Sequence, residues 1–155
     1  MPTDEETLER AREDAKEGKS PSTQAGEFVR EEIEHVREGE HGARSTKQAI
    51  AIGLSKARRA GVKLPPPKAT RASAETRRKA RLDMEKAGKK TKPSRKRSRA
   101  IKAALKREGK AAASTQALSR QARSAAKGRS RKERSQAAHK AAGTRASGRR
   151  KRRGE

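Results

Sequence analysis

The chain has 155 residues, of which 41% are charged and 28% hydrophobic, with one Phe and no Trp or Tyr. The charge is unevenly divided, because residues 1–40 have a net charge of −7 and residues 41–155 have a net charge of +32. Cysteine is absent, which excludes disulfides and thiolate metal sites.

Glycine after helix-compatible stretches, and serine or threonine before them, predict a series of short helices. Three stretches fit the capping box, in which a hydroxyl and an acid or amide three residues later satisfy free backbone amides. They are Thr3-x-x-Glu6, Ser45-x-x-Gln48 and Ser130-x-x-Glu133. Strands are not expected, since β-branched and aromatic residues are few and never alternate. The predicted helices span residues 4–17, 21–38, 46–60, 74–87, 95–108, 115–127 and 131–142.

The second and third predicted helices should pack on each other, because apolar residues recur along one face of each. These residues are Ala25, Phe28, Val29, Ile33 and Val36 in the first of the two, and Ala49, Ile50, Gly53, Leu54 and Ala57 in the second. The connection over residues 39–44 is short, which favours an antiparallel pair. We predict an acidic helix over residues 1–19 and a small amphipathic helical hairpin over residues 20–64.

Three prolines, Pro65 to Pro67, stop the third helix and predict a hinge over residues 65–72. Residues 73–155 form a low-complexity basic tail of Lys, Arg, Ala and Ser. The large apolar residues beyond residue 64 are only Leu82, Met84, Ile101, Leu105 and Leu118. They are too few to offset a chain entropy of roughly 1–2 kcal/mol per residue. We therefore expect a mostly α fold with extensive disorder, in which the short tail helices become ordered on a partner.

The basic tail is expected to bind polyanions, because dense positive charge without acidic neighbours attracts phosphate. The tail has no aromatic residue for base stacking, so contacts should be made to phosphates with little sequence preference. Duplex DNA is the favoured ligand and structured RNA the next. The candidate nucleic-acid-binding residues are Arg44, Lys47, Lys56, Arg58, Arg59, Arg77, Arg78, Lys79, Arg81, Lys89, Lys90, Lys92, Arg95, Lys96, Arg97, Arg99, Lys102, Lys106, Arg107, Arg129, Arg131, Lys132, Arg149, Arg150, Lys151, Arg152 and Arg153.

Sequence-specific reading of DNA finds weaker support. Ala49-x-x-x-Gly53-Leu54-Ser55 matches the turn of a helix-turn-helix, but Arg59 stands where that motif needs an apolar residue. One continuous helix over residues 46–60 explains the segment better. Arg44, Lys47, Lys56, Arg58 and Arg59 would then form one basic face of that helix.

No metal site, cofactor or catalytic residue is predicted. His35 and His41 flank the hairpin loop beside Glu38 and Glu40, but six residues across a glycine turn is not a recognised ligand spacing. No serine has a plausible His/Asp partner set, and no glycine-rich phosphate loop joins a strand to a helix. The small number of core residues leaves no enclosed pocket, so we do not expect an enzyme.

The acidic N-terminal region has three interpretations. It folds over the protein's own basic tail and competes with nucleic acid, it docks onto another basic protein or a second copy of this chain, or it forms a solvated helix surface.

Two stretches carry a resemblance, Lys19–Arg30 (KSPSTQAGEFVR) and His41–Val62 (HGARSTKQAIAIGLSKARRAGV). Together they resemble a family of short basic bacterial proteins of unknown function, over roughly residues 10–67. The resemblance implies a bacterial, cytoplasmic origin and no particular activity. The basic tail is similar in composition to the tails of bacterial histone-like proteins and linker histones.

These observations predict a nucleoid-associated, histone-like protein that binds nucleic acid without sequence specificity, with the acidic N-terminus modulating the binding. Two alternatives stay open: an RNA- or ribosome-associated basic protein, and an interaction or stress-response protein that binds polyphosphate or an acidic partner. No apolar run approaches the roughly 18 residues of a membrane span, and the acidic N-terminus lacks a secretory signal, so we expect a soluble protein of the cytoplasm and nucleoid.

Overall fold

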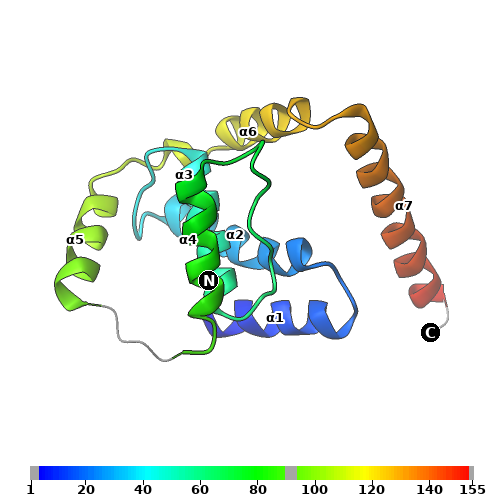
Figure 1. Ribbon diagram of the computed structural model, residues 1–155, viewed down its shortest axis with the longest axis horizontal. Coiled ribbons are helices and arrows are strands. Elements are labelled where there is room, and N and C mark those ends of the chain that lie inside the picture. Colours follow the sequence, from blue (N-terminus) through cyan, green and yellow to red (C-terminus); the bar gives the residue numbers. More distant parts are fainter. Residues whose placement is uncertain (1–3, 90–93, 154–155) are drawn as a thin grey trace. The chain divides into compact units, whose positions relative to one another are not determined.

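The computed structural model describes residues 4–89 and 94–153, and seven α-helices account for 72% of them (Figure 1). The helices are α1 (Asp4–Lys16), α2 (Pro21–Glu38), α3 (Thr46–Arg59), α4 (Ala74–Glu85), α5 (Arg95–Lys106), α6 (Thr115–Lys127) and α7 (Arg131–Arg153), with a short 3₁₀ helix, η1 (Ala111–Ala113). The chain divides into a larger unit that ends at Leu118 and a smaller one that begins at Ser119.

The predicted caps at the starts of α3 and α7 are formed. Ser45 accepts a hydrogen bond from the amide of Gln48 at 3.2 Å, and Ser130 and Glu133 satisfy each other's amides in a complete capping box. Thr3, predicted to open the first helix, lies outside the described residues. Gly39 ends α2 in the left-handed conformation with φ 86°, which favours glycine.

The last helix runs further than predicted. Gly143 was expected to end it, but α7 continues to Arg153. A glycine inside a helix costs only about 1 kcal/mol relative to alanine. The alanines and arginines around Gly143 are good helix formers, so the helix passes through it.

Helices α2 and α3 pack antiparallel. Ala49, near the start of α3, shares a small apolar cluster with Ile33 and Val36, whereas Ala57, near its end, clusters with Ala25 and Phe28. Between these clusters a Cβ on Gly53 would lie 2.7 Å from Val29 Cα, so glycine permits the close approach of the two backbones. Leu8 and Ala11 of α1 pack against the second cluster.

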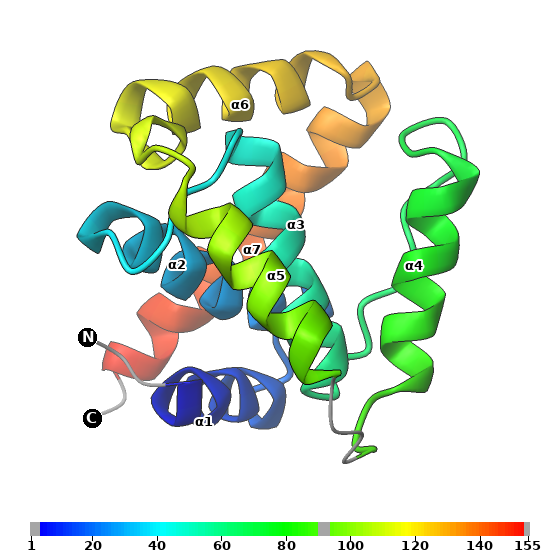
Figure 2. The same ribbon diagram turned by 90° about the vertical axis from the view of Figure 1, so that its left-hand side faces the viewer.

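The expected extensive disorder of the basic region is wrong. Residues 73–153 are largely helical where the structure describes them, and Ala112, Ala113 and Leu118 complete the first apolar cluster. The loop between α2 and α3 is held by two backbone hydrogen bonds, from Gly42 N to Leu105 O at 2.9 Å and from Ala43 N to Gly109 O at 3.2 Å. Figure 2 shows the chain after α5 passing beside this loop. The prediction counted only large apolar side chains and missed that alanines fill the core.

Helix α4 attaches to α3 through one buried alanine and a polar contact. Ala80 is buried, and Ser55 donates a hydrogen bond to Asp83 at 2.6 Å. Of the helices in the described part of the chain, none is both long and apolar enough to cross a lipid bilayer.

Candidate nucleic-acid interface

Among the residues whose exposure the structure describes, helix α5 carries the densest group of exposed cations. The helix buries none of its residues, and residues 86–107 contain eleven Lys or Arg and no Asp or Glu. The exposed cations of α5 and its C-terminal end are Arg95, Lys96, Arg97, Arg99, Lys102, Lys106 and Arg107. With no acidic residue in the segment, their charge is open to an external anion.

The placement of Arg95, Lys96 and Arg97 opposes the dipole of their own helix. They occupy the first turn of α5, where the helix dipole is positive, and Ser94 forms no side-chain capping hydrogen bond there. Cations at a helix N-terminus destabilise the helix. A phosphate bound near this turn would relieve that repulsion, because it interacts favourably with both the cations and the dipole.

Helix α4 adds cations beside its contact with α3. Arg78, Lys79 and Arg81 are exposed and Arg77 is half-buried. Lys79 forms an ion pair with Glu75 at 2.7 Å, and this hydrogen-bonded partner lowers the pKa of the Glu75 carboxyl below its ordinary value. Lys89, just after α4, is also exposed.

The continuous basic face expected on the third helix is not formed. Arg58 is 7% exposed and donates from Nε to the carbonyl of Leu64 at 3.2 Å, and burial lowers its pKa. Lys56 lies 3.1 Å from the buried carboxylate of Glu32, and Arg59 lies 3.9 Å from Asp83. Arg44 and Lys47 are exposed. The segment is one continuous helix, as predicted, and not a helix-turn-helix.

The smaller unit presents cations along a long helix. Arg129, Arg131 and Lys132 are exposed, as predicted from their clustering. Arg149 to Arg153 lie on the last turns of α7, and Lys90 and Lys92 lie outside the described residues. Further exposed cations were not singled out because they are spread singly among alanines, and only helical spacing identifies them. They are Arg120, Arg123, Lys127, Arg134, Lys140 and Arg145.

Three acidic residues near the start of the chain, Asp14, Glu17 and Glu27, pair with cations of the same region. Glu27 accepts from Arg10 Nε at 3.0 Å. Asp14 and Glu17 lie 2.6 and 2.9 Å from Lys19, and their hydrogen bonds raise the pKa of Lys19 above its ordinary value. The Arg10–Glu27 pair joins α1 to α2, and the two pairs of Lys19 hold the turn between these helices.

The structure also brings one carboxylate and two imidazoles together beside the hairpin loop, where the sequence was not expected to form a metal site. Ligand atoms of Glu32, His35 and His41 all lie within 4.8 Å of one another. Glu38 and Glu40 had been considered beside the two histidines, but the third member is Glu32. The signal was its spacing from His35, because residues three apart on a helix share a face.

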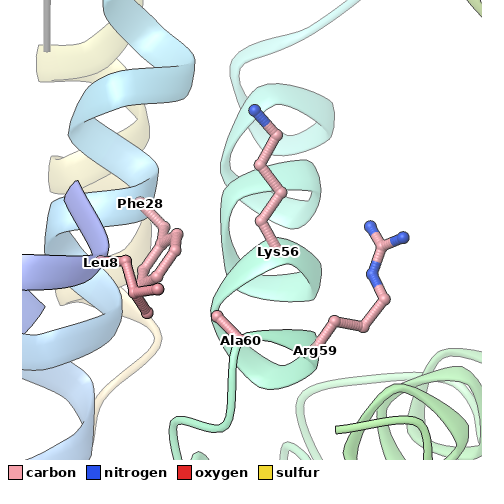
Figure 3. Close-up of a pocket in the computed structure, with 5 residues that line it drawn as sticks. All are labelled: Leu8, Phe28, Lys56, Arg59 and Ala60. Atoms are coloured by element: carbon pink, nitrogen blue, oxygen red, sulfur yellow. The ribbon is translucent and has the colours of Figure 1, made fainter. Parts of the chain in front are cut away.

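A pocket of about 420 Å³ lies between α1, α2 and α3, lined by Leu8, Phe28, Lys56, Arg59 and Ala60. Figure 3 shows Leu8 and Phe28 beside each other, whereas Arg59 extends away from them and Lys56 runs along α3. The two cations therefore do not converge on the apolar wall of the pocket.

Residues 18–68 match a family of unknown function (DUF6496). The matched segment covers α2, the loop after it, α3 and the proline segment, about a third of the chain, and leaves out the basic helices α4 to α7. No curated protein and no solved structure matches this chain.

Proposed function

We propose that this protein binds nucleic acid through the phosphate backbone, without recognising sequence, and that helices α4 to α7 carry the contacts. The observation that supports this most is α5, a helix with no buried residue in a segment of eleven cations and no acids. Nothing in the fold of α5 requires these cations, and those in its first turn oppose its dipole.

The chemistry of the surface favours phosphate over bases. Phe28 is the chain's one aromatic residue other than histidine, and it is 5% exposed within the hairpin core. Recognition of single strands relies on aromatic side chains that stack on bases. Lysine and arginine on rigid helices instead neutralise a charged backbone, which is densest in duplex DNA.

The length of α7 suits a duplex. Its 23 residues extend about 34 Å at 1.5 Å per residue, close to one turn of B-DNA. Three of the exposed arginines of α7 are Arg131, Arg134 and Arg145. Arg134 lies three residues after Arg131, and Arg145 lies eleven residues after Arg134, and both spacings return to nearly the same side of a helix. One side of α7 therefore carries cations over several turns.

As part of the same proposal, the protein is a bacterial, nucleoid-associated protein of the cytoplasm, with a histone-like use of its basic helices. The acidic helix α1 modulates the binding. Its residues Glu5, Glu9 and Glu13 are exposed, so their negative field acts on any phosphate that approaches.

Fluorescence anisotropy of the full chain with two labelled 40-base-pair duplexes of unrelated sequence and one RNA hairpin tests the proposal. We expect the two duplexes to bind within about threefold of each other, because phosphate contacts carry little sequence information. A strong preference for one duplex would contradict the proposal. Much tighter binding to the RNA hairpin would favour an RNA- or ribosome-associated protein. Binding of polyphosphate at a salt concentration that abolishes DNA binding would favour an interaction or stress-response protein.

A further inference from the structure

We propose that Glu32, His35 and His41 form a binding site for one divalent transition-metal ion, with Zn²⁺ the best match. Their ligand atoms lie within 4.8 Å of one another, and two imidazoles with one carboxylate are a donor set that Zn²⁺ accepts. The Glu32 side chain is 0% exposed, and the His35 and His41 side chains are 16% and 20% exposed. The site thus lies at the edge of the hairpin core and is independent of the phosphate-binding surface.

Local structure explains why these three residues meet. Glu32 and His35 are three residues apart on α2, which places both on one helix face. Gly39 then takes the left-handed conformation and turns the chain back, and this turn brings His41 to the same face. The two imidazole rings meet edge to face, with centroids 6.2 Å apart.

The protonation of His41 is set by its backbone contact. His41 Nδ1 lies 3.1 Å from the carbonyl oxygen of Gly42, and a carbonyl only accepts, so Nδ1 carries the hydrogen. In the neutral ring Nε2 then has a lone pair, and it lies 3.3 Å from Glu32 Oε1. Two lone pairs face each other at this distance, and a cation between them removes their repulsion.

The distance also matches metal coordination. With bonds of 2.0–2.2 Å, two ligands on one tetrahedral Zn²⁺ lie about 3.3 Å apart. Glu32 and His41 are already at that spacing, and a ring nitrogen of His35 lies within 4.8 Å of both ligand atoms as the third donor. The hydrogen bond from His41 Nδ1 to Gly42 is the kind of outer contact that orients a metal-bound histidine.

Two charged neighbours tune the site. Lys56 Nζ lies 3.1 Å from Glu32 Oε2, the other oxygen of the carboxylate, and so leaves Oε1 available to a metal ion. The positive charge of Lys56 nevertheless repels a metal ion bound there. Glu40 Oε2 lies 3.8 Å from His35 Nε2 and is half exposed, which places a further carboxylate at the open edge. Replacing Lys56 by a neutral residue should therefore increase metal affinity.

Metal binding would fasten the end of α2 to the following loop. The same loop receives the hydrogen bonds between Gly42 and Leu105 and between Ala43 and Gly109. A metal that binds the folded hairpin and not the unfolded chain stabilises the fold, and the stabilisation grows with the logarithm of the metal concentration once this exceeds the Kd.

Isothermal titration of the metal-free full chain with Zn²⁺ at pH 7.5, with Co²⁺ absorption as a second probe, tests the proposal. We expect one site, an increase in Tm with Zn²⁺, and weaker binding below about pH 6.5, where protons compete for the imidazoles. His35→Ala and His41→Ala should each weaken binding by about tenfold or more. His139→Ala is the matched control, because His139 is the third histidine and is exposed on α7.

A histidine variant could lose Zn²⁺ binding simply because it fails to fold. Lys56→Met avoids this ambiguity, because it should tighten Zn²⁺ binding several-fold, and a misfolded chain would not bind more tightly. Imidazole NMR signals of His35 and His41 should shift with Zn²⁺ while those of His139 do not. Equal Zn²⁺ binding by His41→Ala and His139→Ala would overturn the proposal. Failure of the wild-type chain to bind Zn²⁺ would also overturn it.

Discussion

At the scale of single residues, small side chains decide where this chain comes close to itself. Gly42 is buried in the hairpin loop, and a Cβ there would overlap the backbone carbonyl of Glu108. Ala112 and Ala113 are 7% and 0% exposed and fill the cluster around Val36. In a chain with so few large apolar residues, backbone proximity through glycine and alanine replaces the burial of large side chains.

Gly42→Ala should destabilise the protein by about 1–3 kcal/mol, because backbone atoms on both sides of the contact must move apart. Thermal and urea unfolding measure the change. Gly26→Ala is the control, since Gly26 is exposed on α2 with nothing within 4 Å of the added Cβ. That control should be neutral or stabilising by up to about 1 kcal/mol. Equal effects of the two substitutions would show that the loop does not pack as described.

The Glu75–Lys79 pair predicts a measurable titration. The pKa of Glu75 lies below its ordinary value in the folded chain, chiefly through the hydrogen bond from Lys79. A lowered folded-state pKa stabilises the fold above the unfolded-state value, and that contribution is lost as pH falls through the folded value. Because both side chains are exposed, the effect on stability is small.

Carbon-detected NMR titration of the Glu75 carboxyl measures this shift directly. Lys79→Met should return the Glu75 midpoint to the range of ordinary glutamates. An unchanged midpoint in that variant would exclude Lys79 as the cause.

At the scale of elements, each helix follows from local signals but its packing does not. Capping residues and glycines predicted the helices from α1 to α6 to within a few residues, because these signals act within one turn. The 3₁₀ turn and its place against the hairpin were not predictable. They depend on Thr46 Oγ1 donating to Ala112 O at 2.6 Å and Arg37 Nε donating to Ala113 O at 3.0 Å, contacts over more than sixty positions. The Glu32–His41 contact depends in the same way on the turn at Gly39.

Neutralising the first half of α5 tests the role of that element. The triple change Arg95→Gln, Arg97→Gln and Arg99→Gln should weaken duplex binding by on the order of tenfold or more and reduce the salt slope by about 2–3. Helix content should be retained, since fewer cations then oppose the dipole. Anisotropy and circular dichroism provide the two measurements.

The matched control removes three positive charges from the acidic region, by Arg12→Gln, Lys16→Gln and Lys19→Gln. If α5 makes direct phosphate contacts, the control should change the salt slope little, and any loss of affinity caused by the more negative α1 region should shrink at 300 mM salt. Similar losses in the two triple variants would mean that only net charge matters and that α5 has no special role.

At the scale of the whole molecule, opposite charges are separated along one chain. Helices α1 and α2 hold most of the acids, while α4 to α7 hold most of the cations. Composition predicted this polarity and the helical class, but it also led to the wrong expectation of extensive disorder. A count of large apolar residues does not reveal a core that is filled by alanines and held by backbone hydrogen bonds.

The acidic helix α1 should restrain nucleic-acid binding. Glu5→Gln, Glu9→Gln and Glu13→Gln together remove three exposed negative charges from α1 and leave its packed residues Leu8 and Ala11 in place. We expect duplex affinity to rise several-fold at 50 mM salt and the gain to shrink at 300 mM, because salt screens the repulsion. An affinity that is unchanged at low salt would show that α1 does not restrain nucleic-acid binding.

The measurement that tests the central claim most directly is the affinity of the full chain for one 40-base-pair duplex as a function of salt concentration. Binding through six or more phosphates predicts that log K falls linearly with log salt with a slope of about −5 or steeper, a loss of roughly 10³-fold or more between 50 and 200 mM. A slope near zero, or no binding at 50 mM, would contradict phosphate binding by the basic helices.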